Sequence, residues 1–516
     1  MDEVVGLSAS ELAAGVVAGS LLGVWLLGRL SRLRAAPYPP GPPGLPILGN
    51  AFQIPRERSW ITFADWANDY GNVVHLTALN KHILILSSQE AANELLIKRG
   101  ANYSNRPVLP MCYMSGWRNA FGLLMYGDRL RASKRITRNV LSQHACRQYI
   151  PIQHATALRL VRKLFRNPDQ LRNSLHWFSS FITLKIAYDH EISEDGVDKL
   201  VRMNEEGNNI FSASSSPGWL VDIFPSLQCL PAWFPGAGFV RQAQIWSEIV
   251  FRMHDAPLQI VKDAMADDTS HQQSHSLAAT LLRGENGNGV TKEQEDIIRW
   301  TLGSMYGAGG ETTASTLQTF FLTMALHPDV QRRAQAEIDS VTGGDRLPTY
   351  EDRGSLPYVD ALLKEVMRWH PAVSTSIPHC SIEEDYYRGW TIPAQTIIIV
   401  NIWRIMHDPQ VYPDPHTFNP GRYLNGETNP SLNPDPRASI FGHGRRACPG
   451  RHLADASVFL VIVTSLASFN ISAPENSSGE PVPEPRFIGG VVSHPDDYEC
   501  VLKPRSEQAV KWLQSC

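Results

Sequence analysis

One stretch near the C-terminus carries the residue types that a bound thiolate requires. Residues 441–450 read FGHGRRACPG, which places Cys448 between Gly444 and Gly450 and two residues after Arg446. A thiolate stays ionised beside positive charge or N–H donors, and glycines let the backbone pass close to the sulfur. Arg446 can neutralise a carboxylate on a cofactor held against that sulfur. A buried cysteine in a glycine-rich turn is the alternative, but this combination of residues favours a thiolate ligand.

A second group of chemically active side chains lies in residues 308–313, which read AGGETT. Glu311 and Thr312 are an acid and a hydroxyl side by side, a combination that can transfer protons. Glycines and threonines also weaken regular helical hydrogen bonding and favour a kink. An acid beside two threonines is otherwise typical of a solvated helix face.

The spacing of apolar residues predicts the elements that position these groups. They are helices over residues 296–326, 329–341, 357–370 and 454–468, a hairpin over 73–79 and 82–87, and a strand over 390–402. We therefore expect one mainly α-helical body with small β-sheets, an α+β arrangement, over residues 49–516.

The composition indicates a globular protein and excludes several other classes. Of 516 residues, 43% are hydrophobic and 19% are charged, and the net charge is −4, so no bulk basic surface indicates nucleic-acid binding. The seven cysteines have neither CxxC nor any other paired spacing. This argues against a disulfide framework and against a zinc finger, and it favours a reducing compartment.

The N-terminal residues differ in character from the rest of the chain. Residues 12–28 carry no charge, and a helix over 12–30 would be about 28 Å long, close to the thickness of a bilayer core. Acidic residues precede this run and arginines follow it, so the positive-inside rule predicts a single-pass anchor with residues 1–11 in the lumen and the body in the cytosol. A cleaved signal peptide is the alternative. The basic and Pro/Gly-rich residues 31–48 are predicted to form a stiff hinge.

Together, FGHGRRACPG, AGGETT, and EVMR at 365–368 followed by FNPGRY at 418–423 resemble the cytochrome P450 family. The resemblance covers nearly the whole chain. It implies the cytochrome P450 fold, with haem b (iron-protoporphyrin IX) held between a long distal helix and the helix after the cysteine loop. It also implies that Cys448 is the axial ligand of the haem iron, where a thiolate favours cleavage of the O–O bond.

The same resemblance assigns roles to further residues by position. Glu311 and Thr312 would deliver protons on the distal side of the haem. A structural Glu–Arg–Arg group would hold the loop before the cysteine, and it consists of Glu365, Arg368 and Arg422. The other expected haem contacts are Arg446, His379, Lys134 and Phe441.

One helix departs from the family pattern. Leu130 stands where the family usually has tryptophan, and Lys134 where it usually has arginine. Lys134 can still pair with a haem propionate, but as a point charge without the arginine fork. Loss of the tryptophan removes one expected hydrogen bond.

The same helix predicts a partner. Its basic face consists of Arg129, Arg131, Lys134, Arg135 and Arg138. Such a face is often simply solvated, but in this family it docks an acidic NADPH-cytochrome P450 reductase, through which NADPH is used indirectly. Cytochrome b5 is a second candidate partner.

Two further expectations concern the membrane and the substrate. Residues 227–239, with Trp233 and Phe234, are predicted to be either a membrane-contacting loop or a buried core loop. The family resemblance predicts a substrate pocket lined by residues 108–123, 208–219, 305–308, 373–377 and 488–491. These segments are largely apolar, so the substrate should be lipophilic.

The leading interpretation is a haem-thiolate monooxygenase, an oxidoreductase that uses O2 and NADPH to hydroxylate or otherwise oxidise a lipophilic small molecule. The chain resembles fungal endoplasmic-reticulum members that modify terpenoids, polyketides or indoles in secondary metabolism. A haem-thiolate isomerase or dehydratase without O2 is one alternative, but such variants usually lack the acid–threonine pair. A non-catalytic haem-binding protein is another, but it would have no use for a proton relay or a docking face.

Overall fold

The computed structural model describes residues 36–79, 81–194, 198–266, 276–284, 286–424, 432–474 and 485–514. The predicted lumenal residues, the predicted anchor over 12–30 and the first part of the predicted hinge lie outside these ranges. The α-helices are α2 (Ser59–Tyr70), α3 (Gln89–Ala92), α4 (Gly100–Tyr103), α5 (Pro110–Met114), α6 (Asp128–Leu141), α7 (Gln143–Cys146), α8 (Ile150–Arg166), α9 (Leu171–Tyr188), α10 (Lys199–Ser215), α11 (Leu220–Ile223), α12 (Gly238–Ala266), α13 (Leu277–Arg283), α14 (Lys292–Leu326), α15 (Pro328–Thr342), α16 (Pro357–Trp369), α17 (Ile402–Met406), α18 (Arg437–Ile440), α19 (Arg451–Ser468) and α20 (Glu507–Gln514).

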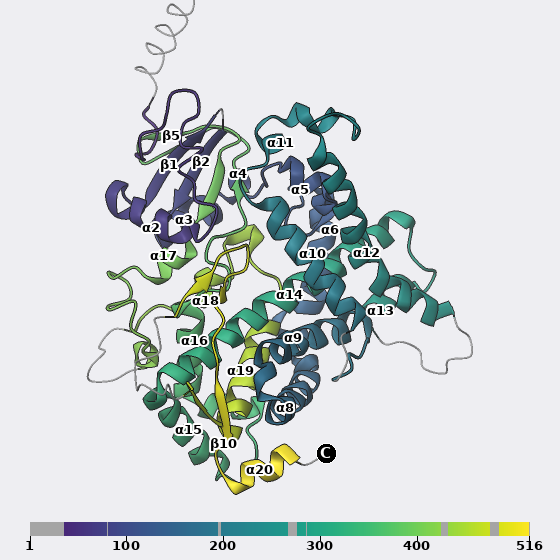
Figure 1. Ribbon diagram of the computed structural model, residues 1–516, viewed down its shortest axis with the longest axis vertical. Coiled ribbons are helices and arrows are strands. Elements are labelled where there is room, and N and C mark those ends of the chain that lie inside the picture. The colour runs from purple at the N-terminus through teal and green to yellow at the C-terminus, as the bar shows by residue number, and fades with distance from the viewer. Residues whose placement is uncertain are drawn as a thin grey trace, which may run out of the picture.

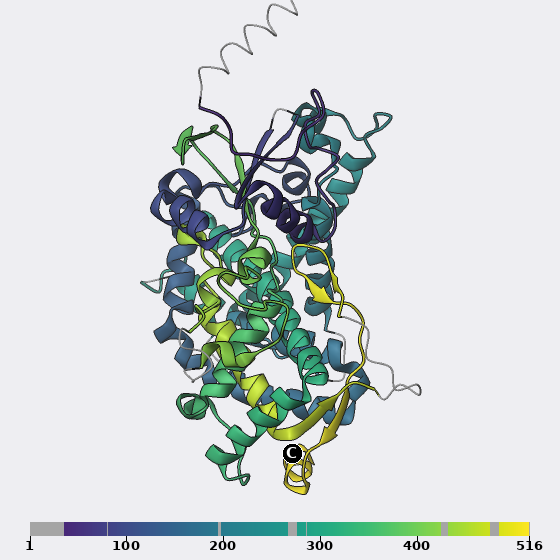
Figure 2. The same ribbon diagram turned by 90° about the vertical axis from the view of Figure 1, so that its left-hand side faces the viewer.

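The strands within the described ranges form four small sheets. They are β1 (Val73–Ala78), β2 (Lys81–Leu86), β3 (His379–Cys380), β4 (Asp385–Tyr387), β5 (Trp390–Ile392), β6 (Ile397–Val400), β7 (Phe469–Ser472), β8 (Phe487–Ile488), β9 (His494–Pro495) and β10 (Val501–Pro504). The largest sheet has the order β1-β2-β6-β3, and the others pair β4 with β5, β7 with β10 and β8 with β9. β1 and β2 lie with α2 at one end of the molecule, and α20 lies at the other end (Figures 1 and 2).

The predicted fold class is confirmed as mostly helical with small sheets. The predicted hairpin is also confirmed, because β1 and β2 pair antiparallel with Val73 opposite Leu86. The four predicted helices correspond to α14, α15, α16 and α19. α14 begins at Lys292, four residues before the predicted start, because Thr291 and Gln294 form a capping box there.

The predicted single strand over residues 390–402 is wrong. This segment forms β5 and β6, which belong to different sheets, and Ile402 already begins α17. Pro393 follows β5 and has no N–H to donate to a sheet. Gln395 then has a φ of 60°, so the backbone turns between the two strands.

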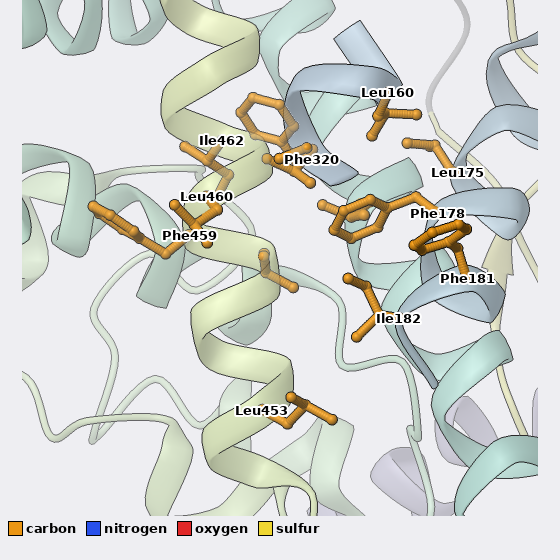
Figure 3. Packing of buried hydrophobic residues seen from close by; sticks show 14 of the residues in the cluster. Leu160, Leu175, Phe178, Phe181, Ile182, Phe320, Leu453, Phe459, Leu460 and Ile462 are labelled. Carbon is orange, nitrogen blue, oxygen red and sulfur yellow. The ribbon is translucent and has the colours of Figure 1, made fainter. Parts of the chain in front are cut away.

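The core forms where α8, α9, α14 and α19 meet. α19 is apolar around nearly its whole circumference, so it must be buried on all sides. Figure 3 shows side chains of these helices converging, among them Leu160, Phe178, Phe320 and Leu460, and all four are fully buried. Among the described residues α19 is the one helix long and apolar enough to cross a bilayer, but 78% of it is buried inside the protein. It is therefore a core helix, as the sequence predicted.

The described part of the predicted hinge lies against the sheets. The carbonyl of Pro40 accepts a hydrogen bond of 2.9 Å from the backbone N–H of His75 in β1, and the carbonyl of Pro37 accepts one of 2.9 Å from Thr391 in β5. A Cβ at Gly41 would lie 2.0 Å from the His75 carbonyl oxygen. The chain is therefore fixed to the body from its first described residues onward.

Candidate functional site

The loop that carries Cys448 is held by its own backbone and by a neighbouring helix. The Cys448 N–H donates to the Phe441 carbonyl at 2.7 Å, which closes the loop directly before α19. Gly444 has a φ of 57°, and a Cβ there would lie 2.3 Å from the Leu96 carbonyl oxygen. Only glycine combines this backbone conformation with so close an approach. At Gly444 the cysteine loop therefore packs closely against the π-helical turn Asn93–Lys98.

The sulfur of Cys448 is surrounded by protein and still accessible. Burial raises the pKa of Cys448, whereas hydrogen bonds from the backbone N–H groups of Gly450 and Arg451 and the charge of Arg451 act in the opposite direction. These donors come from the beginning of α19, where helical N–H groups lack partners within the helix. The side chain is nevertheless exposed. The thiol thus receives N–H donors while the residue keeps accessible surface, an arrangement that suits a thiolate ligand.

Arg446 lies two residues before the cysteine and keeps one nitrogen without a partner. Its Nε donates to the Ser104 carbonyl at 2.7 Å and its Nη2 to the Leu124 carbonyl at 2.6 Å. Its Nη1 is buried, and no described residue accepts a hydrogen bond from it. Burial lowers the pKa of Arg446 to about 10. A buried guanidinium with an orphan N–H requires an anion.

Arg106 joins the same cluster of cations, and the sequence analysis did not identify it. It is 5% exposed and donates to the carbonyl oxygens of Gly122, Ile377 and Pro378, each at 2.8 Å. Burial and the charge of Arg446 hold the pKa of Arg106 well below its usual range. Within the described ranges neither arginine forms a salt bridge with a carboxylate. The only sequence signal was a single arginine before Pro107, which is too common a pattern to indicate a site.

Lys134 adds a third cation to this cluster, and His379 lies beside it as a neutral imidazole. His379 is 5% exposed, its Nδ1 lies 2.8 Å from the Tyr103 carbonyl, and burial together with the charges of Arg106 and Arg446 holds its pKa well below the usual range. Lys134 is exposed and donates to the Arg445 carbonyl at 2.7 Å. Burial and the charge of Arg446 lower the pKa of Lys134. The structure therefore brings together three predicted contacts, the cations Arg446 and Lys134 and the neutral His379, and adds Arg106.

The segment with Glu311 and Thr312 lies in the middle of α14. The helix is continuous through it, and the Thr312 hydroxyl donates to the Ala308 carbonyl at 3.0 Å. Ala308 is exposed, although Gly307 and Gly310 beside it are buried. The helix face with Ala308 and Thr312 therefore borders accessible space in the interior of a helical protein.

Glu311 points to a different set of partners. Its Oε2 lies 3.1 Å from His494 Nε2, and its Oε1 lies 4.0 Å from His176 Nδ1. Burial by itself would raise the pKa of Glu311, but the hydrogen bond from His494 and the charges of His176 and Arg172 outweigh it and lower the pKa. Glu311 is therefore an ionised, mostly buried carboxylate rather than part of a solvated face. Both histidines were missed by the sequence analysis.

The predicted Glu–Arg–Arg group forms one buried network. Arg368 Nε and Nη2 donate to the two oxygens of Glu365 at 2.8 and 2.9 Å, and Arg422 Nε donates to Glu365 Oε1 at 3.2 Å. Glu365 and Arg368 are 0% exposed and Arg422 is 5% exposed. Arg368 also donates to the carbonyls of Met406 and Pro415. The network fixes the irregular chain between α17 and the cysteine loop.

The predicted docking and membrane segments lie at the surface. Arg129 is bound to Asp296 at 2.6 Å and Arg131 to Asp128 at 2.5 Å, whereas Arg135 and Arg138 are exposed. Trp233 is 79% exposed. The alternative that residues 227–239 form a buried core loop is therefore wrong.

The predicted substrate segments are partly core. Met111 and Trp117 are buried at 0% and 5% exposure in apolar clusters with side chains of α12, so they belong to the core. Nearby, a cavity of about 530 Å³ is lined by residues that include Val108, Tyr113 and Met125.

Comparison with known proteins agrees with this geometry. The family model for cytochrome P450 matches residues 39–502. The cytochrome P450 monooxygenase claR of Ampulloclitocybe clavipes is 39% identical over 512 residues, which cover 98% of this chain and 92% of that protein. Cytochrome P450 monooxygenase 208 of Postia placenta is 38% identical over 97% of this chain and 96% of its own length. The tryptamine 4-monooxygenase of Psilocybe cyanescens is 36% identical over 95% of this chain and 97% of its own length. The chain therefore belongs to the cytochrome P450 family and is a monooxygenase of that family.

Proposed function

We propose that the protein binds haem b through Cys448 and uses O2 and electrons from NADPH to oxidise a lipophilic small molecule. The observation that carries this proposal is the environment of Cys448. Its sulfur receives two backbone N–H donors, the residue keeps accessible surface, and the same loop carries Arg446, whose buried Nη1 has no partner among the described residues. A porphyrin with an iron centre and two carboxylates supplies what both groups require.

The cationic cluster fits the two propionates of haem b. Arg446, with its orphan Nη1, and the buried Arg106 would bind carboxylate oxygens by charge-assisted hydrogen bonds. Lys134 would add a further donor, and the negative charge of a bound propionate would favour the doubly protonated form of His379, whose Nε2 could then donate. When bound, the haem would supply the redox centre at which O2 is activated, and thiolate ligation favours cleavage of the O–O bond.

The residues of α14 would then manage protons. The Thr312 hydroxyl lies on the face with the exposed Ala308, where it can donate a hydrogen bond outward once it leaves the Ala308 carbonyl. The ionised Glu311 carboxylate, bound to His494, can accept a proton and pass it on. This pair also argues against a haem-thiolate isomerase, which needs no proton delivery.

The test of haem ligation is spectroscopic. Reduced, CO-treated wild-type protein should show the red-shifted band of a thiolate-bound haem, and Cys448→Ala should lose that band. Cys229→Ala is the matched control, because Cys229 is an exposed thiol outside the site. A band that persists in Cys448→Ala would overturn the assignment.

A second test addresses the propionate site. Arg446→Gln should lose haem to an acceptor such as apomyoglobin faster than the wild type does, because the variant has no charge to bind a carboxylate. Arg445→Gln is the control, since Arg445 is exposed and donates instead to the Tyr126 hydroxyl. Equal rates of haem loss in both variants would remove Arg446 from the site.

The substrate class follows from the relatives and the apolar segments. We propose an oxidation in fungal secondary metabolism, on a terpenoid, polyketide or indole, because one relative is named a tryptamine 4-monooxygenase. Electrons would come from an NADPH-cytochrome P450 reductase docked at the basic face of α6, with cytochrome b5 as a second candidate donor. Co-expression with the reductase, feeding of the three precursor classes and mass spectrometry of the products would test this.

We also propose that the body is held at the cytosolic side of the endoplasmic-reticulum membrane by residues 12–30. The length and apolar character of that run support this, as does the exposed Trp233. Deletion of residues 1–30 should release most of the protein from membranes. Complete retention would show that another segment is the main anchor.

A further inference from the structure

Two histidines and one glutamate converge from three separate elements beside the middle of α14. His176 comes from α9, Glu311 from α14 and His494 from β9. One ligand atom from each residue lies within 4.8 Å of the others. The side chains are 18%, 18% and 13% exposed in that order, so the cluster is sheltered but remains in reach of solvent.

The distances within this His176–Glu311–His494 cluster do not fit an ion-pair network alone. His494 Nε2 lies 3.1 Å from Glu311 Oε2, which is a hydrogen-bond distance. His176 Nδ1 lies 4.0 Å from Oε1, too far for a hydrogen bond, and this nitrogen has no hydrogen-bond partner in the described ranges. Ligand atoms around a tetrahedral Zn²⁺ are about 3.4 Å apart, because Zn–N and Zn–O distances are about 2.1 Å. Movements of about 1 Å or less would therefore bring the three atoms to a common metal ion.

The surroundings of His176 suit a metal ligand. Its other nitrogen, Nε2, lies 3.3 Å from the amide nitrogen Nε2 of the buried Gln318. A half-turn of that amide places its oxygen there instead, so that His176 Nε2 carries the proton and the lone pair of Nδ1 points toward Glu311. Metal-binding histidines are oriented in this way by a partner of the second nitrogen. His494 differs, because its Nδ1 is buried without a partner among the described residues.

The charges around the cluster favour a cation. Arg172 on α9 lies close to His176. Burial lowers the pKa of His176, the charge of Glu311 raises it, and the charges of His494 and Arg172 lower it. The Arg172 guanidinium is itself bound to Asp497 at 2.6 Å. Glu205 on α10 also lies close to the cluster, because burial and the charge of Glu311 both raise the pKa of Glu205. The charge of Arg202 partly offsets Glu205, whereas the arginine that acts on Glu311, Arg172, already has a carboxylate of its own.

We propose that the His176–Glu311–His494 cluster binds a divalent transition-metal ion, with Zn²⁺ as the best match. His176 Nδ1, His494 Nε2 and the Glu311 carboxylate would be the protein ligands, and water would fill the fourth position. Affinity should be about 10- to 100-fold below that of a comparable site in which both histidines have a partner at the second nitrogen, because His494 lacks one among the described residues.

Occupancy would have a consequence for turnover, and this step rests on the proposed function. A carboxylate that coordinates Zn²⁺ is a much weaker base than a free one, because protonation would compete with the metal, so it accepts and passes a proton less readily. Zinc would therefore inhibit substrate oxidation by immobilising Glu311, without displacing the haem.

Zinc binding to the full-length holoprotein can be measured by calorimetry. A Cys229→Ser background removes one exposed thiol that could bind zinc. His176→Gln and His494→Gln each remove one ligand. His190→Gln is the matched control, because it removes an imidazole that lies 2.9 Å from the Asp198 carboxylate without a second histidine. Haem content verifies that each variant is folded, and X-ray absorption at the zinc edge reports the ligands.

The expected result is one equivalent of zinc in the background protein and in His190→Gln, and affinity at least about tenfold weaker in the two ligand variants. The absorption data should show nitrogen and oxygen ligands at about 2.0–2.1 Å. The proposal would be overturned by equal affinity in all variants, by sulfur ligands, or by the absence of saturable binding. A bridging water would then explain the distance of 4.0 Å between His176 Nδ1 and Glu311 Oε1. Zinc binding without a thiolate–haem spectrum would refute the proposed function alone, and that spectrum without zinc binding would refute this inference alone.

Discussion

Arg422 and Glu365 lie 57 positions apart in the chain, and an Arg422 Nε–Glu365 Oε1 contact of 3.2 Å joins them inside the protein. The same oxygen accepts the backbone N–H of Asn419 at 2.9 Å. Arg422 also donates to the carbonyl oxygens of Pro413, Asp414 and Thr417. One carboxylate therefore organises an irregular segment that contains little secondary structure of its own.

Glu365→Gln should destabilise the fold severely. The change leaves the fully buried guanidinium of Arg368 without a counter-charge, which costs about 3–5 kcal/mol. We expect a much lower thermal midpoint and little haem-loaded protein. Asp339→Asn is the control, because Asp339 forms a partly exposed pair with Arg505 at 2.5 Å, and such pairs contribute about 0–1 kcal/mol. Similar losses in both variants would show that burial of the network is unimportant.

Gly444→Ala should disturb the cysteine loop more than a typical glycine substitution. The new methyl group would meet the Leu96 carbonyl oxygen at 2.3 Å, at a φ of 57°, so the loop and the helical turn must separate. We expect a shifted or broadened ferrous–CO band and reduced haem content. Gly354→Ala is the control, because a Cβ there meets nothing within 4 Å. Identical spectra for the two variants would contradict the proposed packing.

Thr312→Ala should uncouple NADPH consumption from product formation. Removal of the hydroxyl leaves the proton pathway incomplete, so hydrogen peroxide should account for a larger share of the electrons used. Thr316→Ala is the matched control, because the Thr316 hydroxyl donates to the Thr312 carbonyl in the same way, one turn further along α14, at 3.0 Å. Peroxide and product are quantified per NADPH. Unchanged coupling in Thr312→Ala would remove this residue from the pathway.

Asp352 should contribute to stability in a pH-dependent manner. A hydrogen bond from Arg346 outweighs burial, and with hydrogen bonds from Thr349 it lowers the pKa of Asp352 to about 2, from an ordinary value of 3.8. A depressed carboxyl pKa stabilises the folded state above the unfolded pKa, and this contribution disappears as the pH falls toward the folded pKa. The difference in thermal midpoint between the wild type and Asp352→Asn should be constant from pH 7 to about pH 5 and shrink between about pH 4 and pH 2. A difference that grows on acidification would contradict this sign.

The sequence predicted those features that depend on local pattern. The helix over residues 296–326 has long apolar periodicity and a proline stop, and α14 ends at Leu326 as predicted. The cysteine loop was recognisable because its glycines, arginine and cysteine are contiguous. The prediction of a single strand over residues 390–402 was wrong because Ile and Val favour strands on both sides of a turn, and Pro393 and Gln395 impose that turn.

The parts of the site that could not be predicted depend on contacts between distant segments. His494 and Glu311 meet only because β9 packs against α14, and nothing in the residues around His494 marks it as a partner of an acid. Arg106 reaches Arg446 from a segment more than 300 positions away in the sequence. Its importance lies in burial and in an unbalanced positive charge, and neither property is visible in the local sequence.

The hydrogen bonds from His75 and Thr391 to the carbonyls of Pro40 and Pro37 limit how the protein can be tethered. A chain fixed to two sheets at these points leaves no slack between Pro37 and the body, so the body cannot swivel about that stretch. If an apolar N-terminal helix is inserted in a bilayer, the docking of Pro37 and Pro40 shortens the connection between that helix and the β1–β2 end of the body. Replacing these prolines with a flexible glycine–serine stretch would lengthen that connection and widen the range of tilts that the enzyme can adopt on the membrane.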